Sequence, residues 1–218
     1  MIPASICQPS VAGWQSKTLV VCWLLLAVAI PVQGIEPKKG SPEEALDRFY
    51  RLINDGALLT RDGWTRGARM FERQSSRPQE EAIFVVTGFP VGNGPMDTTG
   101  DRAVAYQKWV DDVGTIDSKF RFHPPPKEKF EVEGVIRVFN LVHTGRHWEL
   151  SADGRLVEVN GPIEWRLEGS LTTRTASRGA AIRYLNRKLE EITDLTLKAN
   201  AERTIATLKG LPKRRTHI

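Results

Sequence analysis

The chain has 218 residues, of which 40% are hydrophobic, and its formal net charge is +5 at pH 7. This length is ample for one domain with a sizeable hydrophobic core. Both cysteines, Cys7 and Cys22, lie within the first 34 residues. If that segment is removed, the chain can hold no disulfide, thiolate metal site or cysteine nucleophile.

The basic excess belongs to the C-terminal region. Residues 174–218 contain 11 Lys and Arg against 4 Asp and Glu, whereas residues 35–173 contain 19 against 22. Such a region can contact anionic lipid, a cell-envelope polymer or nucleic acid, or it can be the solvated face of helices. Export, which the N-terminal segment indicates, argues against nucleic acid as the partner.

Residues 1–34 have the features of a signal peptide. Lys17 precedes the apolar run TLVVCWLLLAVAI, which ends at Pro31. About 12 apolar residues fit the core of a signal peptide and are too few for a membrane-spanning helix of ~20 residues. We therefore expect cleavage near Gly34–Ile35 and a secreted or periplasmic protein. An uncleaved N-terminal membrane anchor is the alternative.

Residues 35–41 form a linker, and the segment SPEEALDRFYRLINDG that overlaps its end predicts a helix. Ser41 can accept a hydrogen bond from the Glu44 amide. Pro42 suits the first helical position, and Gly56 suits a left-handed helix end. One face of the helix is apolar at helical spacing, with Ala45, Phe49, Leu52 and Ile53.

A second helix is expected over about residues 61–73. Its apolar side consists of Trp64, Ala68 and Phe71. Gly63 and Gly67 each cost about 1 kcal/mol relative to alanine in a helix. The packing of this helix against the rest of the fold must therefore offset that cost.

Patterns of period two follow the helices. We expect strands at residues 82–89, 102–112, 114–123 and 129–143, and a connection rich in glycine and proline at residues 90–101. The triplet TGR at residues 144–146 is expected to be a hairpin turn, as are Asp153–Gly154 and Asn160–Gly161. Many strands with short connections predict an antiparallel meander, of which other elements can cover one face.

The last strand of this sheet contains NGPIEWRLEGS, residues 160–170. Ile163, Trp165 and Leu167 are expected to face an apolar layer. On the opposite face, Glu164, Arg166 and Glu168 are expected to face water. A slip of one residue would exchange the two sets, so the register is strongly fixed.

The helical period returns after residue 176. One apolar stripe consists of Ile182, Leu185, Leu189 and Ile192, and a second consists of Leu197, Ala201, Ile205 and Leu208. Thr193 or Asp194 can cap the second helix, and Gly210 with Pro212 can end it. We expect both helices to be amphipathic covers on the same domain within residues 174–210, followed by a disordered basic tail at residues 211–218.

The leading segment SPEEALDRFYRLINDG, the meander and the final strand IEWRLEG together resemble the nuclear transport factor 2-like superfamily, which includes SnoaL-type and ketosteroid-isomerase-like proteins. The resemblance covers roughly residues 42–169. It implies a cone, in which helices pack into the concave face of a bent sheet, often beside a pocket. The connection at residues 90–101 and the C-terminal helices depart from the minimal cone. These helices could cover the sheet, plug the pocket or mediate pairing.

The expected fold class is therefore α+β. N-terminal helices pack on a curved antiparallel β-sheet in a cone-like domain over residues 42–173, and two extra amphipathic helices follow.

An enzyme of this superfamily would need a general acid or base, normally a carboxylate or histidine in an apolar pocket. Asp111 and its neighbour Asp112 lie close to Trp109 in the sequence, and carboxylates near an aromatic wall can have raised pKa values. His143 is the second candidate proton carrier. For the aspartates, a strand end or turn is the alternative.

The motif HTGRH places His143 and His147 four residues apart. It is not the HExxH zinc motif, because Thr144 stands where that motif has glutamate. We expect a pair of histidines at the rim of the domain, with no metal and no cofactor.

Trp109, Trp148 and Trp165 can line a ligand cavity or pack in an ordinary core. The sequence favours an exported module that binds a small apolar ligand or a protein partner and that could form a homodimer. The alternative is a pocket enzyme of isomerase, dehydratase or hydrolase type that uses Asp111 or His143. The basic C-terminal helices could also contact anionic envelope components weakly, and nucleic acid is not an expected partner.

Overall fold

The computed structural model describes residues 37–74, 76, 84–88, 90–109, 113–125 and 135–211, and for residues 90–94, 108, 109, 135 and 136 it describes the backbone alone. The chain divides into two units, Met1–Ile35 and Glu36–Ile218, and every described residue belongs to the second. The predicted signal peptide and the basic tail after residue 211 lie outside the described residues. No helix in the described ranges has both the length and the hydrophobicity that a membrane crossing requires.

The first helix, α1 (Pro42–Asp55), begins and ends as the sequence predicts. The Ser41 hydroxyl accepts a hydrogen bond from the Glu44 amide at 3.3 Å, and the Glu44 carboxylate accepts one from the Gly40 amide. Gly56 ends the helix at φ 74°, a left-handed conformation that suits glycine because it has no Cβ. The caps therefore fix the helix between these two residues.

A short 3-10 helix, η1 (Ala57–Leu59), leads into α2 (Arg61–Arg69). A Cβ at Gly63 would lie 2.0 Å from the Ala57 carbonyl oxygen. This glycine thus lets the backbones of α2 and η1 meet, which explains its presence in a helix. The predicted helix over residues 61–73 is wrong at its end, because Phe71–Arg73 forms strand β1 of the larger sheet.

Five strands form the larger sheet in the order β1-β8-β7-β4-β3. The other four are β3 (Pro90–Thr99), β4 (Arg102–Trp109), β7 (Val135–Leu150) and β8 (Leu156–Ser170). Neighbouring strands are antiparallel from β3 to β8, as the meander predicts. The edge strand β1 differs, since it pairs in parallel with β8 and β7.

Two of the expected turns are wrong, because β7 and β8 continue through them. Residues 144–146 and Asn160–Gly161 lie opposite each other where the register of the two strands shifts. A Cβ at Gly145 would lie 2.8 Å from the Gly161 carbonyl oxygen. The glycines therefore allow a β-bulge between long strands rather than a reversal of the chain. The expected turn at Asp153–Gly154 is confirmed and joins β7 to β8.

Strand β3 occupies the segment that was expected to be a connection, residues 90–101. It pairs antiparallel with β4, for example Met96 with Ala105. Proline lacks the amide hydrogen that a central strand needs, but an edge strand has one side without a partner. The edge position therefore explains how a segment with Pro90 and Pro95 can be a strand.

A second sheet contains four short strands in the order β6-β5-β2-β9. Their bounds are β2 (Phe84–Thr87), β5 (Gly114–Ile116), β6 (Phe122–His123) and β9 (Arg174–Ser177). β2 pairs antiparallel with β5 and parallel with β9. The expectation of one sheet is therefore wrong, and a turn at Asp117 divides the predicted strand 114–123 into β5 and β6.

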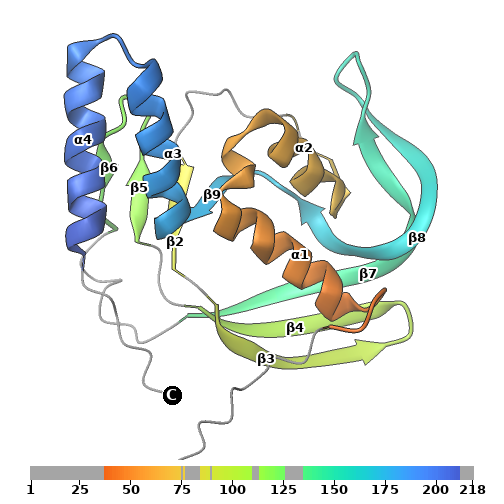
Figure 1. Ribbon diagram of the computed structural model, residues 1–218. Helices are drawn as coiled ribbons and strands as arrows, with labels where there is room; N and C mark the ends of the chain where they lie inside the picture. Colours follow the sequence, from red (N-terminus) through yellow and green to blue (C-terminus); the bar gives the residue numbers. More distant parts are fainter. Residues whose placement is uncertain are drawn as a thin grey trace, which may run out of the picture. The chain divides into compact units, whose positions relative to one another are not determined.

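Two C-terminal helices, α3 (Arg178–Glu191) and α4 (Leu195–Gly210), cover this second sheet side by side (Figure 1). Ser177 caps α3 by accepting a hydrogen bond from the Ala180 amide at 3.3 Å. Asp194 caps α4 by accepting hydrogen bonds from the amides of Thr196 and Leu197. The predicted amphipathic covers are confirmed, and their buried side chains include Tyr184, Leu185, Ile205 and Leu208.

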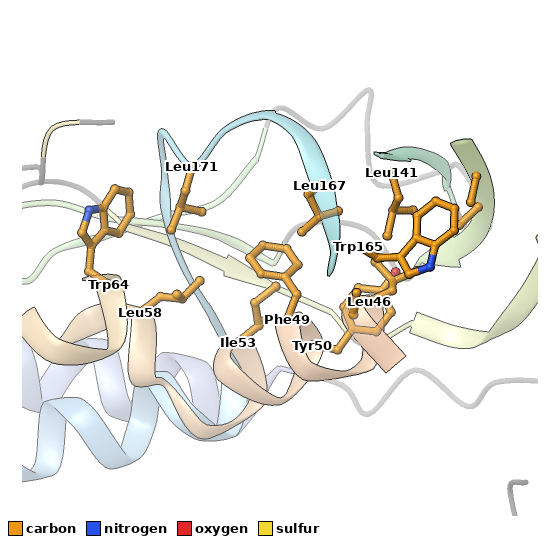
Figure 2. Packing of buried hydrophobic residues seen from close by; sticks show 13 residues of the cluster. Leu46, Phe49, Tyr50, Ile53, Leu58, Trp64, Leu141, Trp165, Leu167 and Leu171 are labelled. Atoms are coloured by element: carbon orange, nitrogen blue, oxygen red, sulfur yellow. The ribbon is translucent and has the colours of Figure 1, made fainter. Parts of the chain in front are cut away.

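The larger sheet has its own hydrophobic core, which α1 completes (Figures 1 and 2). Side chains of α1 point toward β7 and β8, where Leu141, Trp165 and Leu167 are buried. Phe49 of α1 contacts Phe71 edge to face, with ring centroids 5.3 Å apart. The α+β class is confirmed by these two helix-covered sheets, and the cone-like shape stays a prediction.

The alternating pattern of the last strand is confirmed only in part. Trp165 and Leu167 are buried, but Ile163 is 71% exposed beside the bulge. Arg166 is only 3% exposed, because its guanidinium donates to the Arg69 carbonyl oxygen and lies 2.7 Å from Glu164. The predictions for Ile163 and Arg166 are therefore wrong.

Candidate functional site

A cavity of about 780 Å³ lies beside the second sheet, and its lining includes Phe84 and Tyr184 of the hydrophobic core of that sheet. Its walls come from η1, the start of α2, strands β2 and β9, the turn between β5 and β6, and helices α3 and α4. Figure 1 labels these helices and strands, apart from η1. The apolar part of the lining consists of Leu59, Phe84, Phe120, Tyr184, Ile192 and Leu197. The charged part consists of Arg61, Asp117, Lys119, Arg174, Arg187, Lys188 and Glu191.

Asp117 organises the turn that forms one wall of the cavity. Its Oδ1 atom accepts hydrogen bonds from the amides of Lys119 and Arg121, both at 2.9 Å. Its Oδ2 atom accepts one from Arg121 Nε at 2.8 Å and lies 2.9 Å from His123 Nε2. Burial raises the pKa of the Asp117 carboxyl, but the hydrogen bonds from His123, Arg121 and the Lys119 amide outweigh burial and hold that pKa well below its usual value.

The same turn is fixed to α4 by two hydrogen bonds. The Thr204 hydroxyl donates to the Phe120 carbonyl oxygen at 2.6 Å, and the Asn200 side-chain amide donates to the Lys119 carbonyl oxygen at 3.1 Å. Phe120 has a φ of 58°, which is uncommon for a residue with a Cβ. The turn is thus held in one conformation from both sides, and it fixes the position of the Lys119 backbone at the cavity wall.

Arg174 is the buried cation of the cavity lining. It lies on β9 opposite Phe84 of β2 and is only 4% exposed. Its guanidinium donates a hydrogen bond to the Leu59 carbonyl oxygen, which joins β9 to η1. This wall of the cavity therefore contains a buried guanidinium group whose position is fixed.

Three further cations, Arg61, Lys119 and Arg187, are exposed at the cavity. Within the described part of the chain, none of the three forms an ion pair. The fifth cation of the lining, Lys188, lies 2.6 Å from Glu191. Among the described lining residues, positive charge therefore exceeds negative charge.

Three of the residues proposed from sequence, His143, Trp148 and Trp165, lie at the larger sheet, and two of them meet. His143 stacks on Trp165 with ring centroids 4.9 Å apart and an interplanar angle of 24°. Trp165 is part of the α1 core (Figure 2), whereas His143 is exposed. Trp148 lies further along β7, opposite Glu158, and is 37% exposed.

The remaining two predicted site residues cannot be placed in the same way. Asp111 lies outside the described residues, and for Trp109 only the backbone is described, where it pairs with Val135. The roles of both residues stay predictions.

His147 does not join His143. Its Nε2 atom lies 3.0 Å from Glu149 on the same strand, and its ring is largely buried. Over the described ranges, no group of three or more His, Cys, Asp or Glu side chains is arranged to hold a metal ion.

The sequence did not reveal the cavity, because its walls come from segments as distant as Leu59 and Leu197. One local signal was available in RTAS, where Arg174 and Ala176 share a side of the strand. A charged residue that alternates with a small apolar one in this way can mark a buried cation.

Comparison with known proteins assigns the chain to no family. No family model matches it, and neither a curated protein nor a solved structure matches it. The resemblance to the nuclear transport factor 2-like superfamily therefore stays a prediction. Function has to be inferred from the cavity and the residues that line it.

Proposed function

We propose that the protein is a binding module whose small organic ligand occupies the cavity between the second sheet and the C-terminal helices. The observation that carries this proposal is the cavity itself, with a volume of about 780 Å³ and six apolar side chains in its lining. This volume lies within the range of about 300–1,000 Å³ that is typical of ligand pockets in proteins.

The walls of the cavity are well suited to hold a ligand without rearrangement. Tyr184 and Phe84 meet edge to face, with centroids 5.7 Å apart, and Asp117 fixes the opposite turn through its hydrogen bonds. A pocket that is already ordered loses less conformational entropy when a ligand binds.

Binding is favoured over acid or base catalysis by the state of the two carboxylates in the described lining. Asp117 interacts with Arg121 and His123, and Glu191 pairs with Lys188. A carboxylate whose pKa is well below its usual value, as at Asp117, is a weak proton acceptor.

The proposal can be tested with N-phenyl-1-naphthylamine, a neutral aromatic probe that fluoresces in apolar sites. We expect the wild-type protein to bind this probe and the variant Leu197→Trp to bind it at least about tenfold more weakly, since the larger side chain fills the cavity. Leu195→Trp is the matched control, because Leu195 is 80% exposed on the same helix. Equal binding to wild type and folded Leu197→Trp would show that the probe does not use the cavity.

We further propose that the protein acts outside the cytoplasm, after removal of residues 1–34. The support is the apolar run that follows Lys17 and ends at Pro31. N-terminal sequencing of the exported protein is expected to begin near Ile35. A full-length protein retained in the membrane would indicate an uncleaved anchor instead.

A further inference from the structure

We infer that the ligand of this cavity is an amphiphilic organic anion, an apolar body that carries an acidic group. The inference rests on the proposed function and adds the chemical class of the ligand. It depends on the excess of cations over carboxylates in a described lining that also contains six apolar side chains.

The charges of the lining do not cancel. Among the described residues, five cations line the cavity against two carboxylates, Asp117 and Glu191. Each carboxylate already has a cation close by, because Asp117 lies 2.8 Å from Arg121 outside the lining and Glu191 lies 2.6 Å from Lys188. Within the described part of the chain, Arg61, Lys119 and Arg187 therefore have no carboxylate close enough to form an ion pair.

The cations come from separate elements and meet at one cavity. Arg61 begins α2, Lys119 lies in the β5–β6 turn, Arg174 is on β9 and Arg187 is on α3. Convergence from four elements is unlike the basic face of a single helix, whose charges all point into solvent. Cations that surround a cavity with low-dielectric walls raise the local concentration of anions more than a flat surface does.

The position of Arg174 makes this charge more effective than surface charge. Its guanidinium is almost completely buried, and its place is fixed by the bond to the Leu59 carbonyl oxygen. A charge shielded from solvent is screened less by salt than an exposed one. The fork of N–H groups on arginine also suits carboxylate, sulfonate and phosphate oxygens.

The apolar lining excludes a small inorganic anion as the best fit. Phe84, Phe120 and Tyr184 give the cavity aromatic surface, which a bare phosphate or sulfate ion cannot cover. An organic anion can satisfy both parts at once, with its body on the aromatic side chains and its acidic group near the cations.

A matched pair of probes tests the inference. 1-Anilinonaphthalene-8-sulfonate has the aromatic body of N-phenyl-1-naphthylamine plus one sulfonate group. We expect the wild-type protein to bind the sulfonate probe at least about tenfold more tightly than the neutral probe. The substitution Arg187→Gln is expected to lower the affinity for the sulfonate probe about three- to tenfold. The affinity for the neutral probe is expected to stay the same.

The control variant is Lys198→Gln, which removes one exposed positive charge from α4 outside the lining. Its affinities for both probes are expected to equal those of wild type. If Lys198→Gln lowers the affinity for the sulfonate probe as much as Arg187→Gln does, the net charge of the protein causes the effect and the inference is wrong.

The outcomes separate this inference from the proposed function. If wild type binds the two probes with equal affinity and Leu197→Trp binds neither, the proposed binding function is supported and the anionic nature of the ligand is rejected. If Leu197→Trp binds both probes as tightly as wild type does, the proposed function itself is rejected. Complete displacement of the sulfonate probe by millimolar inorganic phosphate would reject the amphiphile, since a small anion would then suffice.

Discussion

Asp117 shows how one carboxylate can determine the conformation of a turn in the wall of the candidate cavity. It accepts hydrogen bonds from two backbone amides and from Arg121, and its side chain is only slightly exposed. Hydrogen bonds to a charged acceptor contribute more to stability than neutral ones. The turn between β5 and β6 therefore depends on this side chain more than on its own backbone propensities.

The variant Asp117→Asn is expected to lose about 1–3 kcal/mol in free energy of unfolding at pH 7, because the amide cannot replace the charged acceptor. The pKa of Asp117 is lower in the folded protein than in the unfolded chain. Its contribution is therefore fully present above the carboxyl pKa of the unfolded chain, about 3.9, and declines as pH falls below that value. Urea unfolding at pH 7 and pH 3 measures both effects.

The control for this prediction is Asp97→Asn, since Asp97 is exposed on β3. We expect the difference between wild type and Asp117→Asn to shrink at pH 3, while Asp97→Asn matches wild type at neutral pH. A difference that grows as the pH falls would contradict the role assigned to the ionised Asp117.

Gly63 is expected to be essential for the contact between α2 and η1. The variant Gly63→Ala should lose about 3 kcal/mol of stability, because its Cβ would lie 2.0 Å from the Ala57 carbonyl oxygen. Gly210→Ala is the comparison, since no atom lies within 4 Å of a Cβ built there. Thermal unfolding of the two variants should show a large decrease for the first and little change for the second.

Prediction from sequence was most successful at single residues with a local role. The caps at Ser41 and Gly56 follow from hydrogen bonds and backbone conformation within a few residues. Arg166 was assigned wrongly because its partner, the Arg69 carbonyl oxygen, is almost one hundred positions away. A side chain whose environment comes from such distant segments cannot be assigned from its neighbours in the sequence.

At the scale of elements, strand β8 has one end on the core and one beyond it. Leu167 is buried against α1, whereas Ile163 lies beside the bulge and is exposed. We expect Leu167→Ala to cost about 2–5 kcal/mol and Ile163→Ala to change stability by less than about 0.5 kcal/mol. Equal losses in chemical denaturation would mean that Ile163 is covered as the alternating pattern alone predicts.

The helices were predicted better than the strands for a physical reason. A helix forms its hydrogen bonds within one segment, so capping residues and a period of 3.6 reveal it. Strand β3 is ordered by its pairing with β4, and its composition of glycine and proline indicates a loop. The bulge at Gly145 was also missed because it depends on a contact with another strand. It forms where Gly145 approaches Gly161 of the facing strand.

At the scale of the whole molecule, the described chain has two cores with different helical covers. The first contains α1 and the larger sheet, and the second contains α3, α4 and the smaller sheet. The sequence predicted the helices of both cores, but it assigned all the predicted strands to one sheet and did not predict β1, β3 or β9. The candidate cavity was missed for that reason, since it lies at the second core.

Removal of α4 tests how far the second core depends on this cover. A chain that ends at Glu191 loses the buried side chains of Ile205 and Leu208, and each contributes about 1.5–3 kcal/mol. Because whole domains are stable by only about 5–15 kcal/mol, we expect a large fall in melting temperature and no binding of either naphthyl probe. A chain that ends at Leu211 is the control and should behave as wild type.

The parallel pairing of β2 with β9 joins residues 84–87 to residues 174–177. A nascent chain therefore leaves one edge of β2 unpaired for as long as it takes to translate the roughly ninety residues between them, several seconds at about 5–20 residues per second. During that time the strand edge needs protection from pairing with other chains. The candidate cavity can only be completed after α4 has left the ribosome, because Leu197 of α4 is part of its lining. A ligand of the cavity would therefore stabilise the finished protein but would not guide the early steps of its synthesis.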